Sequence, residues 1–302
     1  MNLITHAIDL LRTGKILSIP TETVYGLGAD ASNPLAIRQI FALKNRPIDH
    51  PLIVHVANVE RAKEWVFWDD KADALVENYW PGPLTIILKK KPHVLPEVSG
   101  GLDSLGIRVP NHPLTLKLLS QFKGGIAAPS ANRFGRISPT TAQHVREEFG
   151  NRVFVLDGGN CEIGMESTIV DLYNGPAILR PGAVSLEEVQ ACVGSLQSSN
   201  TIAPGTLKAH YAPRTSLFLS ENTNKDVSIL RSKGLKVAVL HALPTKEYGK
   251  KLYAELRRLD KEKHDVLVVE RAKATGLGIA INDRLTKAAT GAPFTFPHGD
   301  SK

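Results

Sequence analysis

The sequence contains little cysteine: Cys161 and Cys192 are its two examples in 302 residues. Two thiols are too few for a disulfide framework and too few for a cluster of cysteine ligands around a metal ion. We therefore expect both to be reduced thiols in a cytoplasmic protein. This scarcity excludes the disulfide-stapled secreted domains as a class.

Long apolar runs are also missing, because charged residues interrupt every hydrophobic stretch. The N-terminal segment MNLITHAIDLLRTGK is typical of a helix, and it lacks the basic, apolar and small-residue order of an export signal. The sequence thus predicts no membrane span and a cytoplasmic location. Its hydrophobic content of 42% is enough for a sizeable core, and its length suggests about two domains.

The net charge of +7 is unevenly distributed. Residues 1–200 hold 19 Lys and Arg against 20 Asp and Glu, whereas residues 201–302 hold 18 against 10. Within the first part, residues 84–136 carry eight bases against two acids. Such a local basic surface suits an anionic small molecule or RNA, but a basic face that is merely solvated is equally compatible with it.

Apolar periodicity predicts alternating helices and strands. Asn33 followed by Pro34 is the signature of a capped helix start. Helices are predicted at 4–14, 33–44, 72–80, 113–122, 141–149, 185–194, 246–263 and 278–289. Strands are predicted at 15–21, 51–57, 84–90, 104–110, 125–131, 152–158, 167–173, 177–182, 236–242 and 265–272.

These elements divide into two α/β domains. The first spans residues 1–195, and the second, smaller one spans 215–302. Residues 196–214 between them are rich in Ser, Gly and Pro without periodicity, which is typical of a linker. The tail from residue 290 to 302 also lacks a pattern and is expected to be loose.

No phosphate-binding glycine motif of the G-x-x-x-x-G-K-[ST] or G-x-G-x-x-G type is present. Instead, polar side chains gather where predicted strands and helices end, which is where open α/β sheets commonly place ligands. They are Thr21, Glu22, Thr23, Tyr25, Lys44, Arg46, His55, Arg108, Ser130, Asn132, Ser167 and Arg180.

Taken singly, each of these residues has an ordinary structural explanation. Lys44 and Arg46 lie near the C-terminus of a predicted helix, where a cation interacts favourably with the helix dipole and is often only solvated. His55 on an apolar strand is typical of a buried core histidine, and Arg180 opens an Arg-Pro-Gly turn. The segment PSAN, residues 129–132, equally suits a capping turn.

In order along the chain, however, the motifs resemble one family. They are PTETVYGLG, KNRP with PLIVHV, WPGPLT, GIRVP, APSAN, ESTIVD, LRPG and APGTLKAHYAPR. Over residues 15–214 they resemble the Sua5/YrdC family of L-threonylcarbamoyladenylate synthases, and the last third is similar to the accessory Sua5 domain. The resemblance implies a YrdC-like open, twisted, mixed sheet with helices, followed by a smaller Rossmann-like α/β domain.

The resemblance also implies a reaction. L-threonine, bicarbonate and ATP, with Mg²⁺ and no prosthetic group, would give threonylcarbamoyl-AMP and pyrophosphate. A separate threonylcarbamoyl transferase would then modify the tRNA adenosine next to the anticodon, and direct binding of tRNA would be weak. No metal-ligand motif is visible, so Mg²⁺ is inferred from ATP.

Site roles follow from the resemblance in the same way. Lys44, Arg46, Ser130 and Asn132 match the family's catalytic tetrad. The ATP-binding set would be that tetrad with His50, Ser104, Ser138, Arg180 and the linker residue Tyr211, which would act as a lid. The threonine-binding set would be Arg108, facing the carboxylate, with Thr23, His55, Ala128 and Ser167. Because the set is complete by Arg180 except for Tyr211, we expect the linker and the second domain to act separately.

Two alternatives remain at this point. The first is an RNA-binding module of the same fold without chemistry, which the basic stretch at 84–136 favours and the near-neutral total of residues 1–200 does not. The second is a carbamoyl-transfer subdomain, which the lack of zinc-type Cys/His clusters disfavours.

Overall fold

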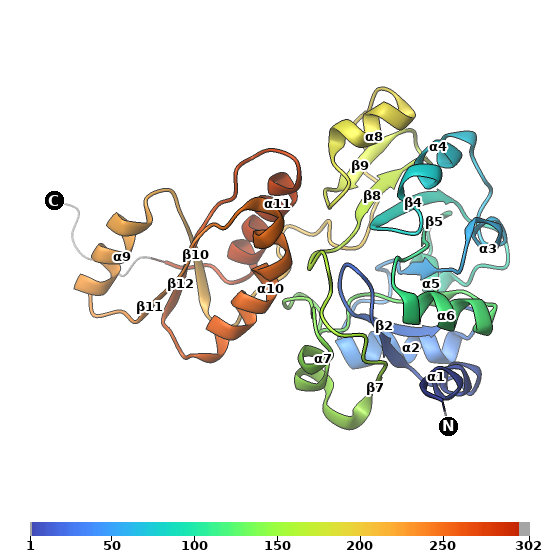
Figure 1. The fold of residues 1–302 in the computed structure, drawn as a ribbon, viewed down its shortest axis with the longest axis horizontal. Coiled ribbons are helices and arrows are strands. Elements are labelled where there is room, and N and C mark those ends of the chain that lie inside the picture. The colour runs from blue at the N-terminus through green and yellow to red at the C-terminus, as the bar shows by residue number, and fades with distance from the viewer. Residues whose placement is uncertain (1, 296–302) are drawn as a thin grey trace.

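The computed structural model describes residues 2–295. It contains a large N-terminal domain built on a nine-stranded sheet and a smaller C-terminal domain built on a three-stranded sheet. The two domains lie side by side, and helices α10 (Thr245–Lys261) and α11 (Leu277–Gly291) face the first domain (Figure 1). Helix α9 (Thr223–Ser232) covers the opposite face of the small sheet.

The large sheet is mixed, and its strand order is β7-β1-β2-β6-β3-β5-β4-β8-β9. Its strands are β1 (Leu17–Ile19), β2 (Gly26–Asp30), β3 (Ile53–His55), β4 (Leu84–Lys89), β5 (Ser104–Arg108), β6 (Ile126–Ala127), β7 (Phe154–Val155), β8 (Thr168–Asp171) and β9 (Ala177–Arg180). Strands β3 and β5 run parallel, with His55 opposite Arg108. Two residues expected at the site therefore end neighbouring strands.

Eight α-helices surround this sheet in the described part of the first domain. They are α1 (Leu3–Arg12), α2 (Pro34–Lys44), α3 (Val59–Lys63), α4 (Asp70–Tyr79), α5 (Pro96–Ser99), α6 (Pro113–Phe122), α7 (Ala142–Phe149) and α8 (Leu186–Val193), and a short 3-10 helix follows α7 at Gly150–Arg152. Helix α2 starts as the sequence predicts, because the Asn33 side chain accepts hydrogen bonds from two backbone N–H groups of the first turn. It ends at Lys44, and the left-handed backbone of the next residue, Asn45 (φ 52°), turns the chain toward Arg46.

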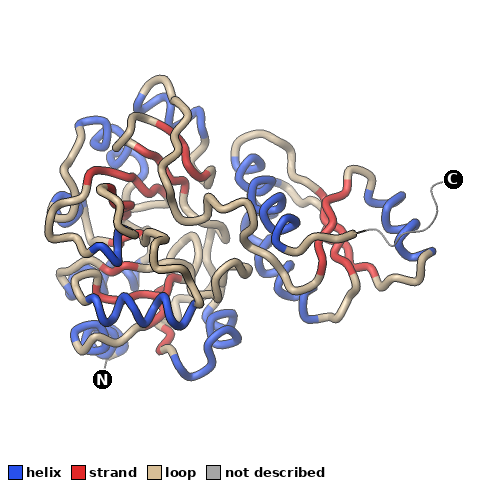
Figure 2. The backbone as a smooth tube through the Cα atoms, turned by 180° about the vertical axis from the view of Figure 1, so that it is seen from behind, coloured by secondary structure: helices blue, strands red, loops and turns tan. Residues whose placement is uncertain are grey.

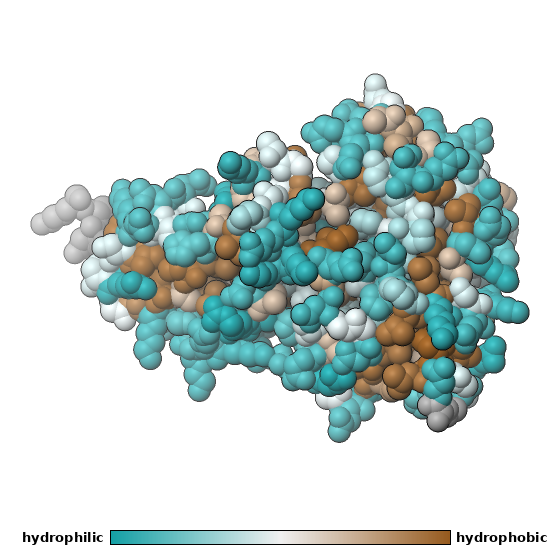
Figure 3. All heavy atoms as spheres, viewed as in Figure 1, coloured by the Kyte–Doolittle hydropathy of each residue, from teal (hydrophilic) through white to brown (hydrophobic). Residues whose placement is uncertain are grey.

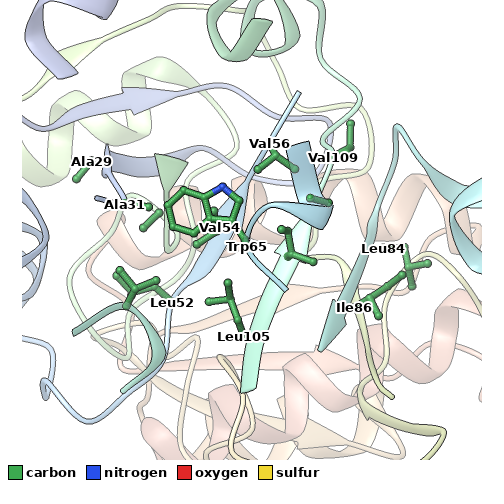
Figure 4. Packing of buried hydrophobic residues seen from close by; sticks show 14 of the residues in the cluster. Ala29, Ala31, Leu52, Val54, Val56, Trp65, Leu84, Ile86, Leu105 and Val109 are labelled. Atoms are coloured by element: carbon green, nitrogen blue, oxygen red, sulfur yellow. The ribbon is translucent and has the colours of Figure 1, made fainter. Parts of the chain in front are cut away.

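The core of the first domain lies between the sheet and these helices. Trp65 lies beside Val54 and Ala31, with Leu52 and Leu105 completing the packing around it (Figure 4). These side chains are at most 6% exposed. The close packing fixes β3 and β5, and with them the polar residues at the strand ends.

The second domain is a parallel α/β unit. Its strands β10 (Ser216–Ser220), β11 (Val237–Leu240) and β12 (Val266–Glu270) have the order β10-β12-β11. The segment that joins the domains, residues 194–215, contains no helix or strand and runs between them (Figure 2).

The two domains share one apolar cluster. Val24, Ile137, Met165 and Tyr211 from the first domain and the linker pack with side chains of α10 and α11. The buried side chains that α10 and α11 contribute are Tyr248, Leu252, Tyr253, Leu256, Leu259, Ala280, Ile281, Leu285 and Ala288. The second domain is therefore packed directly against the part of the chain that carries the predicted site.

Outside this interface, polar and charged residues cover most of the face seen in Figure 3, and apolar residues occupy smaller areas between them. Within the described residues, no helix combines the length and the apolar character needed to cross a bilayer.

Most predicted elements are present, and the fold class is confirmed. Sequence reasoning missed β2, α3, α5, β10 and α9, which are short or lack a clear apolar repeat; β2, for example, is Gly-Leu-Gly-Ala-Asp. The expectation of a loose tail from residue 290 is wrong for its first two residues, because α11 continues through Gly291. Residues 296–302 of that tail lie outside the described residues. The linker and domain boundaries stay predictions.

Candidate active site

A cavity opens in the first domain where the loop after β1 meets the ends of β3, β5, β6 and β9, and residues 204–211 of the linker close one side of it. Nine of the fourteen predicted site residues line it. They are Thr23, Arg46, His55, Arg108, Ala128, Ser130, Ser167, Arg180 and Tyr211. The tertiary structure thus brings together residues that the sequence separates widely.

Arg108 is buried and held by three acceptors. Its Nε donates to the carbonyl of Gly82 (3.0 Å), its Nη1 to Thr23 Oγ1 (2.9 Å) and its Nη2 to Glu22 Oε1 (2.6 Å). A guanidinium has five N–H groups, so one remains on each Nη atom. Those two suit a carboxylate, although the ion pair with Glu22 already offsets part of the positive charge.

His55 lies opposite Arg108 and is neutral at physiological pH. Its burial and the neighbouring Arg108 lower its pKa from 6.5 to about 3. Among the described residues no hydrogen-bond partner faces its Nδ1 atom. It can therefore offer a substrate a hydrogen bond without adding charge.

Lys44 and Arg46 occupy different places. The Lys44 ammonium is buried beneath the PSAN loop and donates to the carbonyls of Ser130 (2.6 Å) and Asn132. Burial, with Arg46 nearby, lowers the pKa of Lys44 well below its usual value. Lys44 thus holds the loop in shape, whereas Arg46 lines the cavity itself.

Arg46 keeps unused hydrogen-bonding capacity. Its Nη2 donates to the Pro51 carbonyl (2.9 Å), and its guanidinium carbon lies 5.5 Å from the centre of the Phe134 ring. Its Nε has no partner among the described residues. Burial lowers the pKa of Arg46 to about 10, so it stays charged at neutral pH.

Arg180 connects the cavity wall to the linker. Its Nε and Nη2 donate to the carbonyl and hydroxyl of Ser167 (both 3.0 Å), and its Nη1 donates to the carbonyl of Pro204 (3.0 Å). The Ser167 hydroxyl also bonds with Thr85 Oγ1 at 2.8 Å. Two predicted residues from different substrate sets, Ser167 and Arg180, are therefore one hydrogen-bonded unit.

The other predicted residues lie around the cavity without lining it. Ser104 lines a small neighbouring cavity with Thr85 and Ile202. The Asn132 amide donates to the carbonyls of Arg133 and Arg136, and the His50 ring lies 5.3 Å from that of Phe134. The hydroxyl of Ser138 donates to Glu166 Oε1 (2.5 Å). Direct contacts of these residues with ATP stay predictions.

Glu166 and His210 line the cavity and were missed as site residues. Each stands next to a residue that was found, in MESTIVD and HYAP, but a single carboxylate or imidazole gives no local signal of burial. Burial would raise the pKa of Glu166, but Arg284 and Arg180 and the bond from Ser138 outweigh it and lower the pKa to about 2. Burial lowers the pKa of His210 to about 3. Glu166 is thus an anion at neutral pH, and His210 is uncharged.

Gly205 allows the linker to approach the wall. Its φ of +79° is unfavourable for other residues, and a Cβ there would lie 2.4 Å from the Tyr211 hydroxyl and 3.1 Å from Arg180 Cδ. The ring of Tyr211 is only 1% exposed. The lid expected at Tyr211 is thus in contact with the wall of the cavity.

Buried polar atoms without a partner gather in or beside the cavity, as far as the described residues show. They are Glu22 Oε2, Arg46 Nε, His55 Nδ1, Asn132 Oδ1, His210 Nδ1 and the Tyr211 hydroxyl. Unpartnered buried polar atoms are costly in a folded protein. The lining of the cavity also has an excess of positive charge, because it contains three arginines and one glutamate. The arrangement suits a polar ligand that carries negative charge.

Comparison with known proteins gives matches over nearly the whole chain. Residues 9–182 match the family model of the Sua5, YciO and YrdC proteins, described as telomere recombination, and residues 184–290 match the model of the threonylcarbamoyl-AMP synthase C-terminal domain. The threonylcarbamoyl-AMP synthase of Bacillus subtilis is 38% identical over 322 residues, covering 95% of this chain and 93% of that protein.

The synthase of Pyrococcus abyssi is 36% identical over 318 residues, covering 94% of this chain and 93% of that protein. The crystal structure of P. abyssi Sua5 complexed with L-threonine superposes with a TM-score of 0.91 at 35% identity. That superposition covers 96% of this chain and 94% of the other. The likeness therefore includes both domains.

Proposed function

The chain belongs to the Sua5/YrdC family of threonylcarbamoyl-AMP synthases, and we propose that it joins L-threonine, bicarbonate and ATP into threonylcarbamoyl-AMP and pyrophosphate. The observation that carries this proposal is the cavity, where Arg46, Arg108 and Arg180 converge with the unpartnered polar atoms around them. The product would enter tRNA threonylcarbamoyladenosine modification.

The chemistry needs positioning more than a nucleophile. The amine of threonine captures carbon dioxide as a carbamate, and a carbamate oxygen attacks the α-phosphate of ATP while pyrophosphate leaves. Negative charge builds on the leaving group, so fixed cations and hydrogen-bond donors lower the barrier. By reaction type the enzyme would be a nucleotidyltransferase.

Arg108 would hold the threonine carboxylate through its two remaining N–H groups, with Thr23, His55 and Ser167 around the rest of the amino acid. Polar groups that bond the substrate hydroxyl would reject analogues that lack it. Arg46 and Ser130 would meet the phosphates. Lys44 would act from beneath, by fixing the loop that carries Ser130.

Mg²⁺ would enter with ATP. No group of three or more His, Cys, Asp or Glu side chains in residues 2–295 is arranged to hold a metal ion. Glu22 Oε2 and Asn132 Oδ1 are buried oxygen atoms that no described residue bonds, and oxygen is the ligand that Mg²⁺ prefers. Neither residue lines the cavity, however, so the phosphates themselves would hold the ion, and the ion would neutralise part of their charge.

The transferase that receives the product, and a cytoplasmic location, remain predictions from the sequence. The comparisons give no support to an RNA-binding module without chemistry.

The test is pyrophosphate release from ATP, with mass-spectrometric detection of threonylcarbamoyl-AMP. We expect release to require both threonine and bicarbonate, and to fall strongly when 2-aminobutyrate, which lacks the hydroxyl, replaces threonine. Release that is independent of either substrate would contradict the proposal.

A further inference from the structure

Helix α11 of the second domain contacts the linker along one face. Lys287 makes two of these contacts. Its backbone carbonyl accepts a hydrogen bond from the backbone N–H of His210 (3.2 Å), and its side-chain Nζ donates to the carbonyl of Gly205 (2.8 Å). Gly291, one turn further, lies so close to Ala212 that a Cβ on it would be 2.8 Å from the Ala212 side chain. The linker is thus held on both sides of its exposed turn.

Arg284 lies on the same face, three residues before Lys287. It is fully buried, and its guanidinium carbon lies 5.2 Å from the centre of the Tyr211 ring. Its Nε donates to Glu166 Oε2 (3.0 Å), and its Nη2 donates to the carbonyl of Pro181 (2.9 Å). One side chain of the second domain therefore touches the lid, the cavity wall and the turn after β9.

Tyr253 on α10 completes this arrangement. Its ring stacks on that of Tyr211 with centres 5.8 Å apart, and its hydroxyl donates to Glu166 Oε2 (2.8 Å). Tyr211 therefore has Arg284 and Tyr253 as neighbours, both from the second domain. The linker and the second domain are therefore in direct contact, which the expectation that they act separately did not include.

We propose that Arg284 and Lys287 are positioning residues of the synthase, which clamp residues 204–212 over the cavity and so keep the bound intermediate from water. The proposal rests on the proposed function. Water that reached the mixed anhydride would convert threonylcarbamoyl-AMP into AMP and the threonine carbamate, which then releases carbon dioxide. A closed linker excludes that water, as lids do in other enzymes.

The clamp can be tested without turnover, by limited trypsin digestion of the full chain. Lys208 lies in the exposed part of the linker, between the two backbone contacts with Lys287. Replacing Lys287→Met keeps the aliphatic stem but removes the charged donor to Gly205. We expect cleavage after Lys208 to become roughly tenfold faster, because the linker opens more often.

Lys251→Met is the matched control. Lys251 and Lys287 each pair with a carboxylate four residues earlier on a helix of the second domain. Lys251 is exposed, and its ammonium donates to Glu247 instead of to the linker. The control should be cleaved after Lys208 at the wild-type rate. Equal rates in all three proteins would overturn the clamp.

The second measurement is the yield of threonylcarbamoyl-AMP per pyrophosphate released. We expect this ratio to fall severalfold in Lys287→Met and in Arg284→Lys, which keeps a positive charge beside Glu166. A merely structural role would lower the amount of active enzyme and leave the ratio unchanged, so faster cleavage with an unchanged ratio would refute retention of the intermediate. If the wild type made no threonylcarbamoyl-AMP, the proposed function would fail, while digestion would still decide the clamp.

Discussion

The Glu166→Gln variant should be less stable than the wild type by an amount that depends on pH. Glu166 is buried, which by itself would raise its pKa, but Arg284 and its other neighbours lower the pKa from 4.5 to about 2. The difference of 4.5 − 2 = 2.5, at 1.36 kcal/mol per pKa unit, corresponds to about 3 kcal/mol of folding free energy at neutral pH. Glutamine keeps the shape of the side chain but leaves Arg284 without this carboxylate.

The pH dependence follows from the direction of the shift. A carboxyl whose pKa is lowered by folding stabilises the protein above its unfolded pKa, and this contribution is lost as pH falls through the folded pKa. Between pH 7 and pH 3 the free energy of unfolding of the wild type should therefore fall by about 2 kcal/mol through Glu166. The Gln variant lacks this contribution at both pH values. The stability gap between the two proteins should shrink from about 3 to about 1 kcal/mol.

Urea unfolding followed by fluorescence at both pH values measures this gap. Glu187→Gln, which changes an exposed carboxylate in the first turn of α8, is the control and should stay within about 0.5 kcal/mol of the wild type. A gap for Glu166→Gln that is below about 1 kcal/mol at pH 7, or that is the same at both pH values, would refute the reasoning.

Three further substitutions test the cavity. Arg46→Ala removes a charged donor and should lower turnover about ten- to a hundredfold in the pyrophosphate assay, so unchanged kinetics would contradict its role at the phosphates. Arg108→Leu should raise the KM for threonine strongly and leave the KM for ATP nearly unchanged. The reverse pattern would mean that Arg108 belongs to the ATP site and not to the threonine site. Gly205→Ala should cost about 1 kcal/mol in strain and displace Tyr211, which would lower the ratio of threonylcarbamoyl-AMP to pyrophosphate; a wild-type ratio would show that the contact does not matter.

The sequence determined most of the local structure by itself. The apolar spacing of Ile4, Ala7, Ile8 and Leu11 marks the buried face of α1, and Asn33 caps α2 as predicted. These features depend on residues within one or two helical turns of each other, so they can be predicted from the sequence alone. The order of the motifs along the chain was equally sufficient to indicate the family.

Only the tertiary structure decided how the site is assembled. Lys44 matches the family's catalytic motif, yet its ammonium bonds carbonyls 86 and 88 residues away and supports the loop from beneath. Glu22 is paired with Arg108 across 86 residues, which reduces the charge available to a substrate carboxylate. Neither partner can be identified from its sequence neighbours.

The contact between Glu166 and Arg284 joins two domains across 118 residues. In MESTIVD the glutamate has no feature that distinguishes it from a solvated carboxylate, and the arginine in NDRL resembles any charge on an amphipathic helix. Packing of α10 and α11 against the linker removes water from both groups and leaves each as the other's partner. Local sequence sets which helix forms, but the free energy of an ion pair depends on burial, which only the packed domains determine.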